Sequence, residues 1–342
     1  MDSPSKLGFR MPAEWVPHKA VWLAWPHDTV TFPGKVENVE KTFIEIIKAI
    51  HEGENVKLLV LNENMEERVK NLLKSADVDL SKVIFYITTY ADVWIRDYGP
   101  IFITNPETKE KAWVKWDYNA YGKFPTLLKD NEVFLSLKDK VGGRMFKPGI
   151  IMEGGSIEIN GEGTLITTEQ CLLNTNRNPK LDRTQIEEFL KDNIGIKKII
   201  WLKDGLVNDH TDGHIDDMVR FVNPSTIICG YEENQNDPNF KILDENYKIL
   251  ENSRDQDSKP LNLIKLPMPY LNYDDGTKAP ASYANFYIGN KVVLVSIFKD
   301  PNDEKALSII QSCFPDRKVI GIDSRDLIYG GGGLHCVTCQ EP

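Results

Sequence analysis

Residues 330–339 present a cysteine directly after four glycines, in the order Gly-Gly-Gly-Gly-Leu-His-Cys-Val-Thr-Cys. Consecutive glycines allow backbone conformations with positive φ and let another part of the chain or a ligand approach closely. A cysteine thiol presented in this way can act as a nucleophile once it is deprotonated. The alternative is a flexible tail that carries a buried or surface cysteine, so a catalytic role for Cys336 requires partners elsewhere in the chain.

The segment 208–217 is the richest in groups that could do chemistry, with two histidines and four aspartates in ten residues. His210 and His214 stand four apart and could bind a metal on a helix, but a glycine and the aspartates disfavour a helix there. In the other interpretation His214 and Asp216 alternate along a strand that continues into residues 218–222. Residues two apart in a strand face the same side, so the imidazole and the carboxylate would point into one site. We favour the strand.

Cys336 and Cys339 form a Cys-x-x-Cys pair, which can be half of a zinc site or a redox dithiol. The other three cysteines of the chain stand alone, so no second pair is available to complete four-sulfur ligation. A single nucleophile, Cys336, with a distant histidine, His214, is the simpler hypothesis, because such partners meet in the fold. We therefore expect no metal at this site.

Two further stretches place carboxylates next to predicted strands. Residues 94–97 put the Trp94 ring, a cation and the Asp97 carboxylate just before a strand, which on its own is typical of an ion pair near a turn. Glu153 precedes two glycines and a strand, which on its own is typical of a solvated glutamate at the entry to a hairpin. Neither stretch predicts a site without the others.

The elements that must position these residues follow a mixed α/β order. Strands and helices first alternate, with strands expected at 20–25, 56–61 and 83–88 and helices at 37–51 and 62–75. A hairpin, a helix and a strand then recur, as in 156–168, 181–194 and 198–202, in 218–230 and 238–252, and in 283–297, 302–313 and 318–322. Such a repeat predicts a closed ring of similar units that forms one domain over residues 1–342.

Composition excludes several classes of protein. The chain has 342 residues, 41% hydrophobic and 27% charged, which is typical of a globular protein. Its five cysteines are an odd number without a disulfide pattern. The first thirty residues show no basic region followed by an apolar run, and no window approaches 18 uninterrupted apolar residues. We therefore expect a cytoplasmic protein that is not associated with a membrane. A net charge of −10 argues against nucleic acid as a partner and is compatible with a cationic substrate.

Five motifs in order along the chain resemble the agmatine deiminase family, a branch of the guanidino-group-modifying enzymes. They are MPAEW, WIRDYGP, MEGGSIE, DGHIDD and GGGGLHCVT, which begin at residues 11, 94, 152, 212 and 330. The resemblance implies a five-bladed α/β propeller, the pentein fold, with the active site at its centre. Gly333 and Cys339 depart from the family pattern, in which Asn and Gln are more usual, and both could alter the wall of the pocket.

The resemblance also implies the roles of the site residues. Cys336 matches the nucleophile and His214 the general acid and base. Asp97 and Asp216 match the two carboxylates that bind the guanidinium, Glu153 the carboxylate that supports the histidine, and Trp94 an aromatic residue beside the substrate.

The reaction implied is hydrolysis of agmatine to N-carbamoylputrescine and ammonia through an amidino-cysteine, with no metal, nucleotide or organic cofactor. A small cationic guanidine is then the partner, and a homodimer or higher homo-oligomer is compatible with the sequence. The alternatives are an arginine or peptidyl-arginine deiminase, in which Arg96 could bind a carboxylate, an amidinotransferase, a metallohydrolase built on His210 and His214, and a binding protein on the same fold.

Overall fold

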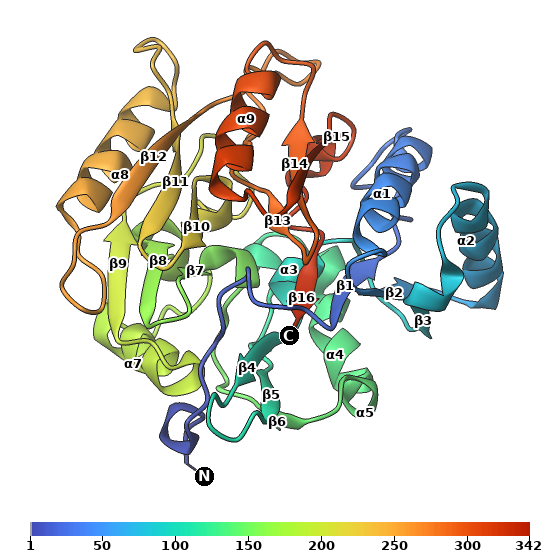
Figure 1. Cartoon of the computed structure of the whole chain (residues 1–342), viewed down its shortest axis with the longest axis horizontal. Coiled ribbons are helices and arrows are strands. Elements are labelled where there is room, and N and C mark those ends of the chain that lie inside the picture. Colours follow the sequence, from blue (N-terminus) through green and yellow to red (C-terminus); the bar gives the residue numbers. More distant parts are fainter. Residues whose placement is uncertain (1) are drawn as a thin grey trace. The chain divides into compact units, whose positions relative to one another are not determined.

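The chain adopts the mixed α/β fold that the sequence predicts (Figure 1). The computed structural model describes residues 2–342, and their strands form five separate sheets, one of four strands and four of three strands. Five is the number of blades that the resemblance implies. The arrangement of the five sheets as blades around one axis stays a prediction.

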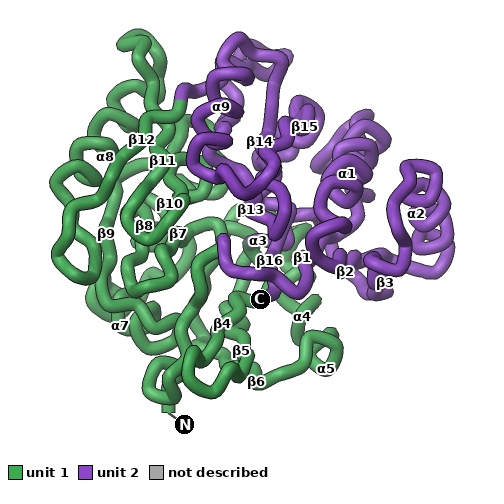
Figure 2. The backbone as a smooth tube through the Cα atoms, in the orientation of Figure 1, with its two compact units in different colours: residues 1–14, 97–266 green, residues 15–96, 267–342 purple. Residues whose placement is uncertain are grey.

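The chain divides into two compact units (Figure 2). Unit 1 comprises residues 1–14 and 97–266, and unit 2 comprises residues 15–96 and 267–342. The boundary at residues 96 and 97 falls inside the short helix α3, Ile95–Tyr98. The single domain predicted for residues 1–342 includes both units and stays a prediction.

Unit 1 holds three of the sheets, each with an antiparallel strand pair and a third strand. In the first two, the third strand runs parallel to its neighbour. The sheets are β4 (Ile101–Thr104), β5 (Lys111–Val114) and β6 (Arg144–Phe146); β7 (Glu158–Ile159), β8 (Thr164–Thr168) and β9 (Lys198–Leu202); and β10 (Val219–Asn223), β11 (Thr226–Tyr231) and β12 (Asn262–Pro267). The helices are α4 (Val133–Ser136), α5 (Lys138–Val141), α6 (Glu169–Leu172), α7 (Arg183–Ile194) and α8 (Phe240–Asn252).

Unit 2 holds the other two sheets, which again combine an antiparallel pair with parallel strands. They are β16 (Cys339–Glu341), β1 (Ala20–Ala24), β2 (Asn55–Val60) and β3 (Val83–Ile87), and β13 (Tyr287–Ile288), β14 (Val292–Ile297) and β15 (Lys318–Asp323). The helices are α1 (Val36–Ile50), α2 (Glu63–Ser75) and α9 (Asp303–Cys313). None of the helices within residues 2–342 is long and apolar enough to cross a membrane.

Local sequence signals account for where the main helices lie. In α1, Phe43, Ile46 and Ile50 recur at helical spacing and are buried on one face in the core of unit 2. The side chain of Asn62 caps α2 by accepting a hydrogen bond from the backbone N–H of Met65, at 2.9 Å. In α7 the side chain of Asp182 closes a capping box, which fixes the first turn.

The C-terminal strand β16 completes the sheet that begins with β1. It pairs antiparallel with β1, and the buried carboxylate of Glu341 accepts hydrogen bonds from Trp22 Nε1 at 2.8 Å and from Lys57 Nζ at 2.7 Å. Lys57 belongs to β2, so this carboxylate links three neighbouring strands of one sheet. The segment that contains Cys336 therefore ends at a fixed point in unit 2.

Replacing Glu341 with alanine should destabilise the protein by roughly 3 to 5 kcal/mol, because the change leaves the Lys57 ammonium buried without its counter-charge. The measurement is the midpoint of urea denaturation. Asp244→Ala, which removes an exposed ion pair with Lys248 on α8, is the matched control and should hardly move the midpoint. Equal midpoints for the two variants would show that Glu341 does not stabilise this sheet.

Candidate active site

In unit 1 the loop that carries His214 is folded by one carboxylate. Asp209 Oδ2 accepts hydrogen bonds from the backbone N–H groups of Gly213 at 2.8 Å and of His214 at 3.0 Å, and Asp209 Oδ1 accepts from that of Thr211 at 2.7 Å. His214 is 1% exposed, so its ring is presented to the interior.

The predicted strand through His214 and Asp216 is wrong. Residues Ile215–Asp217 form a short 3₁₀ helix, η6, and the strand β10 begins only at Val219. The reason is that the backbone N–H groups before it bond to Asp209 and not to a neighbouring strand. His214 and Asp216 nevertheless reach one site, because both approach Gly155.

Gly155 is the point at which three predicted residues converge. A Cβ atom there would lie 2.6 Å from His214 Nδ1 and 3.0 Å from both Asp216 Oδ2 and Asp97 Oδ1. Real Cβ atoms do not approach other atoms so closely, so only glycine fits, and its backbone N–H donates a 3.0 Å hydrogen bond to Asp97 Oδ1. The glycines of the MEGGSIE motif therefore allow the carboxylates and the imidazole to gather.

Asp97 lies at the centre of this cluster and is buried. Its Oδ1 atom is 3.6 Å from His214 Nδ1, and its Oδ2 atom accepts a 2.7 Å hydrogen bond from the hydroxyl of Tyr121. Burial, aided by repulsion from Asp216 and Glu153, raises the pKa of Asp97 to about 6, although His214 and the Tyr121 hydroxyl oppose the rise.

The other ionisable groups of the cluster are shifted as well. Burial opposes the charged form of His214, but Asp97 above all, with Cys171 and Asp216, outweighs it and raises the pKa of the imidazole well above its usual value. Burial, together with repulsion from Asp216, raises the pKa of Asp217 well above its ordinary range. The cluster thus favours a protonated imidazole and penalises further negative charge.

Glu153 is completely buried and is held by an arginine that the sequence motifs do not indicate. Arg177 Nε donates to Glu153 Oε1 at 3.0 Å, while Arg177 Nη1 bonds to Asp212 and Nη2 donates to the carbonyl of Thr211 at 2.7 Å. The guanidinium of Arg177 therefore fixes Glu153 to the histidine loop. The alternative of a solvated glutamate at residue 153 is excluded by this burial.

In unit 2, Cys336 is held by an asparagine that the motifs do not indicate either. Asn285 Nδ2 lies 3.1 Å from Cys336 Sγ and donates to it, while Asn285 Oδ1 accepts from the backbone N–H groups of His335 at 2.9 Å and of Cys336 at 3.3 Å. One amide therefore orients the loop and places a donor on the sulfur. An N–H donor favours the thiolate form.

Trp94 lies beside Cys336 in the same unit because the intervening residue is glycine. A Cβ atom on Gly332 would lie 2.7 Å from Trp94 Cζ3 and 3.1 Å from Cys336 Sγ. The indole Nε1 donates to Asp92 Oδ2 at 3.0 Å, which fixes the ring. The glycine run therefore makes room for an aromatic ring next to the thiol.

The predicted residues thus divide between the units. Asp97, Glu153, His214 and Asp216 gather in unit 1, whereas Cys336 and Trp94 lie together in unit 2. His210 is exposed and, within the described part of the chain, belongs to no group of metal-ligating side chains.

The sequence signals for Arg177 and Asn285 are weak. Arg177 lies in the polar loop Asn-Thr-Asn-Arg-Asn-Pro and Asn285 within a segment that is predicted to be a strand.

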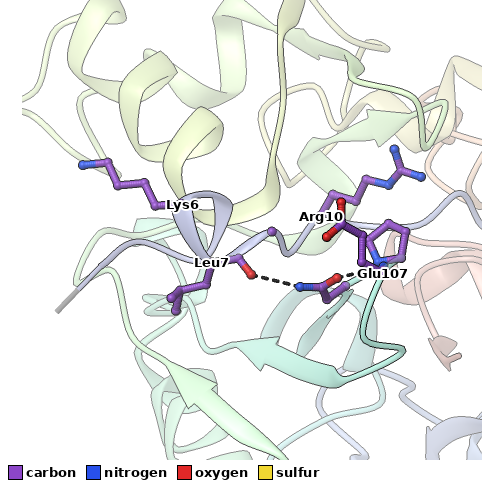
Figure 3. Close-up of a pocket in the computed structure, with 7 residues that line it drawn as sticks. Lys6, Leu7, Arg10 and Glu107 are labelled. Carbon is purple, nitrogen blue, oxygen red and sulfur yellow. Dashed lines mark hydrogen bonds between the residues drawn. The ribbon is translucent and has the colours of Figure 1, made fainter.

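A separate hollow of about 570 Å³ lies on unit 1, near the N-terminal segment (Figure 3). Its lining includes Lys6, Leu7, Arg10 and Glu107, and Asn105 Nδ2 donates to the carbonyl of Leu7 at 3.0 Å. None of the predicted site residues lines it. We therefore assign it no part in the chemistry.

Comparison with known families matches residues 10–342 to the Porphyromonas-type peptidyl-arginine deiminases. The chain is 35% identical to the agmatine deiminase of Ectopseudomonas mendocina, over 99% of this chain and 97% of that protein. Both matches extend over nearly the whole chain.

Solved structures agree with this relationship. The agmatine deiminase of Enterococcus faecalis has a TM-score of 0.91 at 31% identity, covering 100% of this chain and 98% of that one. A cysteine-to-serine variant of the C. jejuni agmatine deiminase with substrate bound has a TM-score of 0.87 at 32% identity, covering 97% and 96%. An amidinotransferase from Microseira wollei, with a TM-score of 0.54 at 12% identity, shares the fold alone. The chain therefore belongs to the agmatine deiminases of the Porphyromonas-type peptidyl-arginine deiminase family.

Proposed function

We propose that this protein hydrolyses agmatine to N-carbamoylputrescine and ammonia. The observation that carries the proposal is the buried acidic cluster around His214, in a chain that aligns end to end with agmatine deiminases. A guanidinium is planar, spreads its charge over three nitrogens and keeps its proton at physiological pH. It is therefore the kind of cation that a set of buried carboxylates can bind edge-on.

Asp97 and Asp216 are the carboxylates that we assign to the guanidinium. The charge of Arg177 is already matched by Glu153 and Asp212, so Arg177 does not neutralise them. Each charge-assisted hydrogen bond to the substrate contributes on the order of 1.5 to 3 kcal/mol. Binding through both edges would fix the guanidinium carbon for attack.

Cys336 is the nucleophile in this proposal. Its thiolate attacks the guanidinium carbon and forms a C–S bond, giving a tetrahedral adduct. His214 donates a proton to the departing nitrogen, the C–N bond breaks, and ammonia leaves an amidino-thioether on Cys336. His214 then takes a proton from water, the hydroxide attacks the same carbon, and the C–S bond breaks to return the thiolate and release the product. Glu153 supports His214, and Trp94 lines the site beside the sulfur.

The second candidate is deimination of arginine or of a peptide arginine, which the description of the matching family favours. Arginine carries a carboxylate beside the amine that agmatine also has, and a peptide arginine carries peptide groups at this position. Arg96 is the cation predicted to bind that carboxylate, but its Nη1 atom donates to Gln340 Oε1 at 2.6 Å and its Nε atom to the carbonyl of His335 at 3.3 Å. It is thereby engaged in holding the cysteine loop.

Ammonia release from agmatine, from arginine and from a peptide ending in arginine, each with and without a chelator, tests the assignment. We expect release from agmatine alone, at a rate that the chelator does not lower. Release from arginine or the peptide would be consistent with the cysteine mechanism and would change the substrate that we assign. No release from any of the three would contradict the proposed function.

Changing Cys336 to alanine should abolish agmatine turnover without unfolding the protein, because no other group can carry the amidino intermediate. Cys339→Ala is the matched control, since Cys339 is equally buried three residues further along the chain, and it should remain active. Turnover is followed by ammonia release and folding by circular dichroism. Substantial activity in Cys336→Ala would rule out the covalent mechanism.

The pH dependence should report Asp97, whose pKa is raised to about 6. Because the cation binds the ionised carboxylate, kcat/KM for agmatine should fall by about one log unit per pH unit as the pH drops below this value. Bound substrate favours the ionised form, so the acidic limb of kcat should lie at lower pH. The alkaline limb should follow loss of the proton from His214, whose pKa is raised. Acidic limbs at the same pH in kcat and kcat/KM would contradict the role of Asp97 in binding.

A further inference from the structure

We propose that Glu153, Cys171 and His214 form a binding site for a thiophilic divalent cation of the Zn²⁺ class, and that the cation inhibits the enzyme by occupying His214. The inhibition rests on the function proposed above, whereas the binding does not. Cys171 has no part in the deimination chemistry, so its place beside His214 needs a separate explanation.

Three separate segments bring the ligand atoms together. Glu153 precedes η5 (Gly154–Ser156), Cys171 lies in α6, and His214 follows the turn that Asp209 closes. One ligand atom from each of the three residues lies within 4.8 Å of the other two, and all three side chains are buried. Thr168 Oγ1 accepts a 3.2 Å hydrogen bond from the Cys171 N–H, which caps α6 and fixes the thiol in the cluster.

Three atoms of the cluster lack the hydrogen bonds that buried polar atoms normally make. Among residues 2–342, Glu153 Oε2 has no hydrogen-bond partner, and neither ring nitrogen of His214 makes a hydrogen bond of standard geometry, although the Cys171 thiol is close enough to raise the pKa of the imidazole. The other carboxylate oxygen of Glu153 is taken by Arg177. Because a buried polar atom without a hydrogen bond is costly, these atoms are available to a ligand that can pair them.

The set of donors selects the kind of cation. Sulfur, imidazole nitrogen and one carboxylate oxygen form a typical ligand set for Zn²⁺, whereas Mg²⁺ and Ca²⁺ require oxygen ligands. Tetrahedral Zn²⁺ keeps its ligand atoms about 3.5 Å apart, so no pair of ligand atoms needs to approach by more than about 1.3 Å. Binding replaces the S–H bond of Cys171 with an S–Zn bond and one N–H bond of the His214 imidazolium with an N–Zn bond, and both protons pass to solvent.

The charges around the cluster favour a dication. The cation nearest to Glu153 is Arg177, whose charge is matched by Glu153 and Asp212. Asp97 and Asp216 are buried nearby and add negative potential when they are ionised. A metal held by His214 and Glu153 removes the proton donor from the reaction, so turnover stops without any change to Cys336.

Binding is tested first in the inactive Cys336→Ala protein, with Cd²⁺ as a spectroscopic probe. We expect one equivalent of Cd²⁺ to give a thiolate charge-transfer absorbance in the ultraviolet, which a chelator abolishes and Mg²⁺ does not produce. Adding Cys171→Ala, or Cys171→Ser if the alanine variant does not fold, should remove the absorbance. Adding Cys229→Ala should not, because Cys229 is a buried thiol of the same unit, in β11, outside the metal-ligating group.

Inhibition is then tested in the active protein with Zn²⁺. For each variant, turnover of agmatine is measured relative to the rate of the same variant in chelator. The Zn²⁺ concentration that halves turnover should be at least about tenfold higher for Cys171→Ala than for Cys229→Ala. This factor corresponds to about 1.4 kcal/mol of binding free energy. Equal inhibition of the two variants, an increase of turnover by Zn²⁺, or no Cd²⁺ absorbance in Cys336→Ala would each overturn the proposal. The Cd²⁺ absorbance is measured without turnover, so it tests metal binding separately from the proposed hydrolysis of agmatine.

Discussion

The structure of unit 1 depends on burying several carboxylates around a single imidazole. Charges removed from water are costly unless neighbouring groups pair with them. Tyr121 and the backbone of Gly155 bond to Asp97, and Arg177 bonds to Glu153. These contacts satisfy part of the cluster and leave an excess of acid. That excess raises the pKa of Asp97 and keeps the imidazole protonated. A bound cation can then pair with the ionised carboxylates, and the imidazole can donate a proton.

Unit 2 meets a different constraint, which is to hold a sulfur atom in place. The loop around Cys336 has no regular structure of its own until β16 begins at Cys339. The side chain of Asn285 supplies the hydrogen bonds that a helix or strand would otherwise provide. Its Oδ1 atom accepts from two consecutive backbone N–H groups, and its Nδ2 atom donates to the sulfur of Cys336. Gly332 then lets the ring of Trp94 approach the same atom. Orientation and activation of the thiol thus come from one side chain.

The sequence predicts the regular elements well where hydrophobic spacing and caps agree. The strand β9 and the helix α7 lie within two residues of their predicted ranges, and α2 begins one residue after the predicted start of its helix. Prediction failed where another contact took the place of pairing between strands. The side chain of Asp209 folds the histidine loop, so no strand passes through His214. The backbone carbonyl of Asn285 accepts a hydrogen bond from the N–H of His335, outside any strand, and β13 comprises only Tyr287–Ile288.

The residues of the candidate site differ in the same way. Cys336, Glu153 and His214 stand in glycine-rich or strongly charged motifs of unusual composition, whereas Arg177, Tyr121 and Asn285 each act through a contact with a residue more than 20 positions away. Periodicity reports only neighbours along the chain, so it cannot indicate such contacts.

The same electrostatics bear on which guanidine is the better substrate. Agmatine adds a second positive charge at its tail, whereas arginine adds a carboxylate next to its amine. Both Arg177 and Arg96 already have partners, since Arg177 bonds to Glu153 and Asp212 and Arg96 bonds to Gln340 and the carbonyl of His335. Moving either to a substrate carboxylate would release a contact that fixes the histidine loop or the cysteine loop. A dication needs no such movement and is attracted by the excess of buried acid, so the charges of this chain favour agmatine.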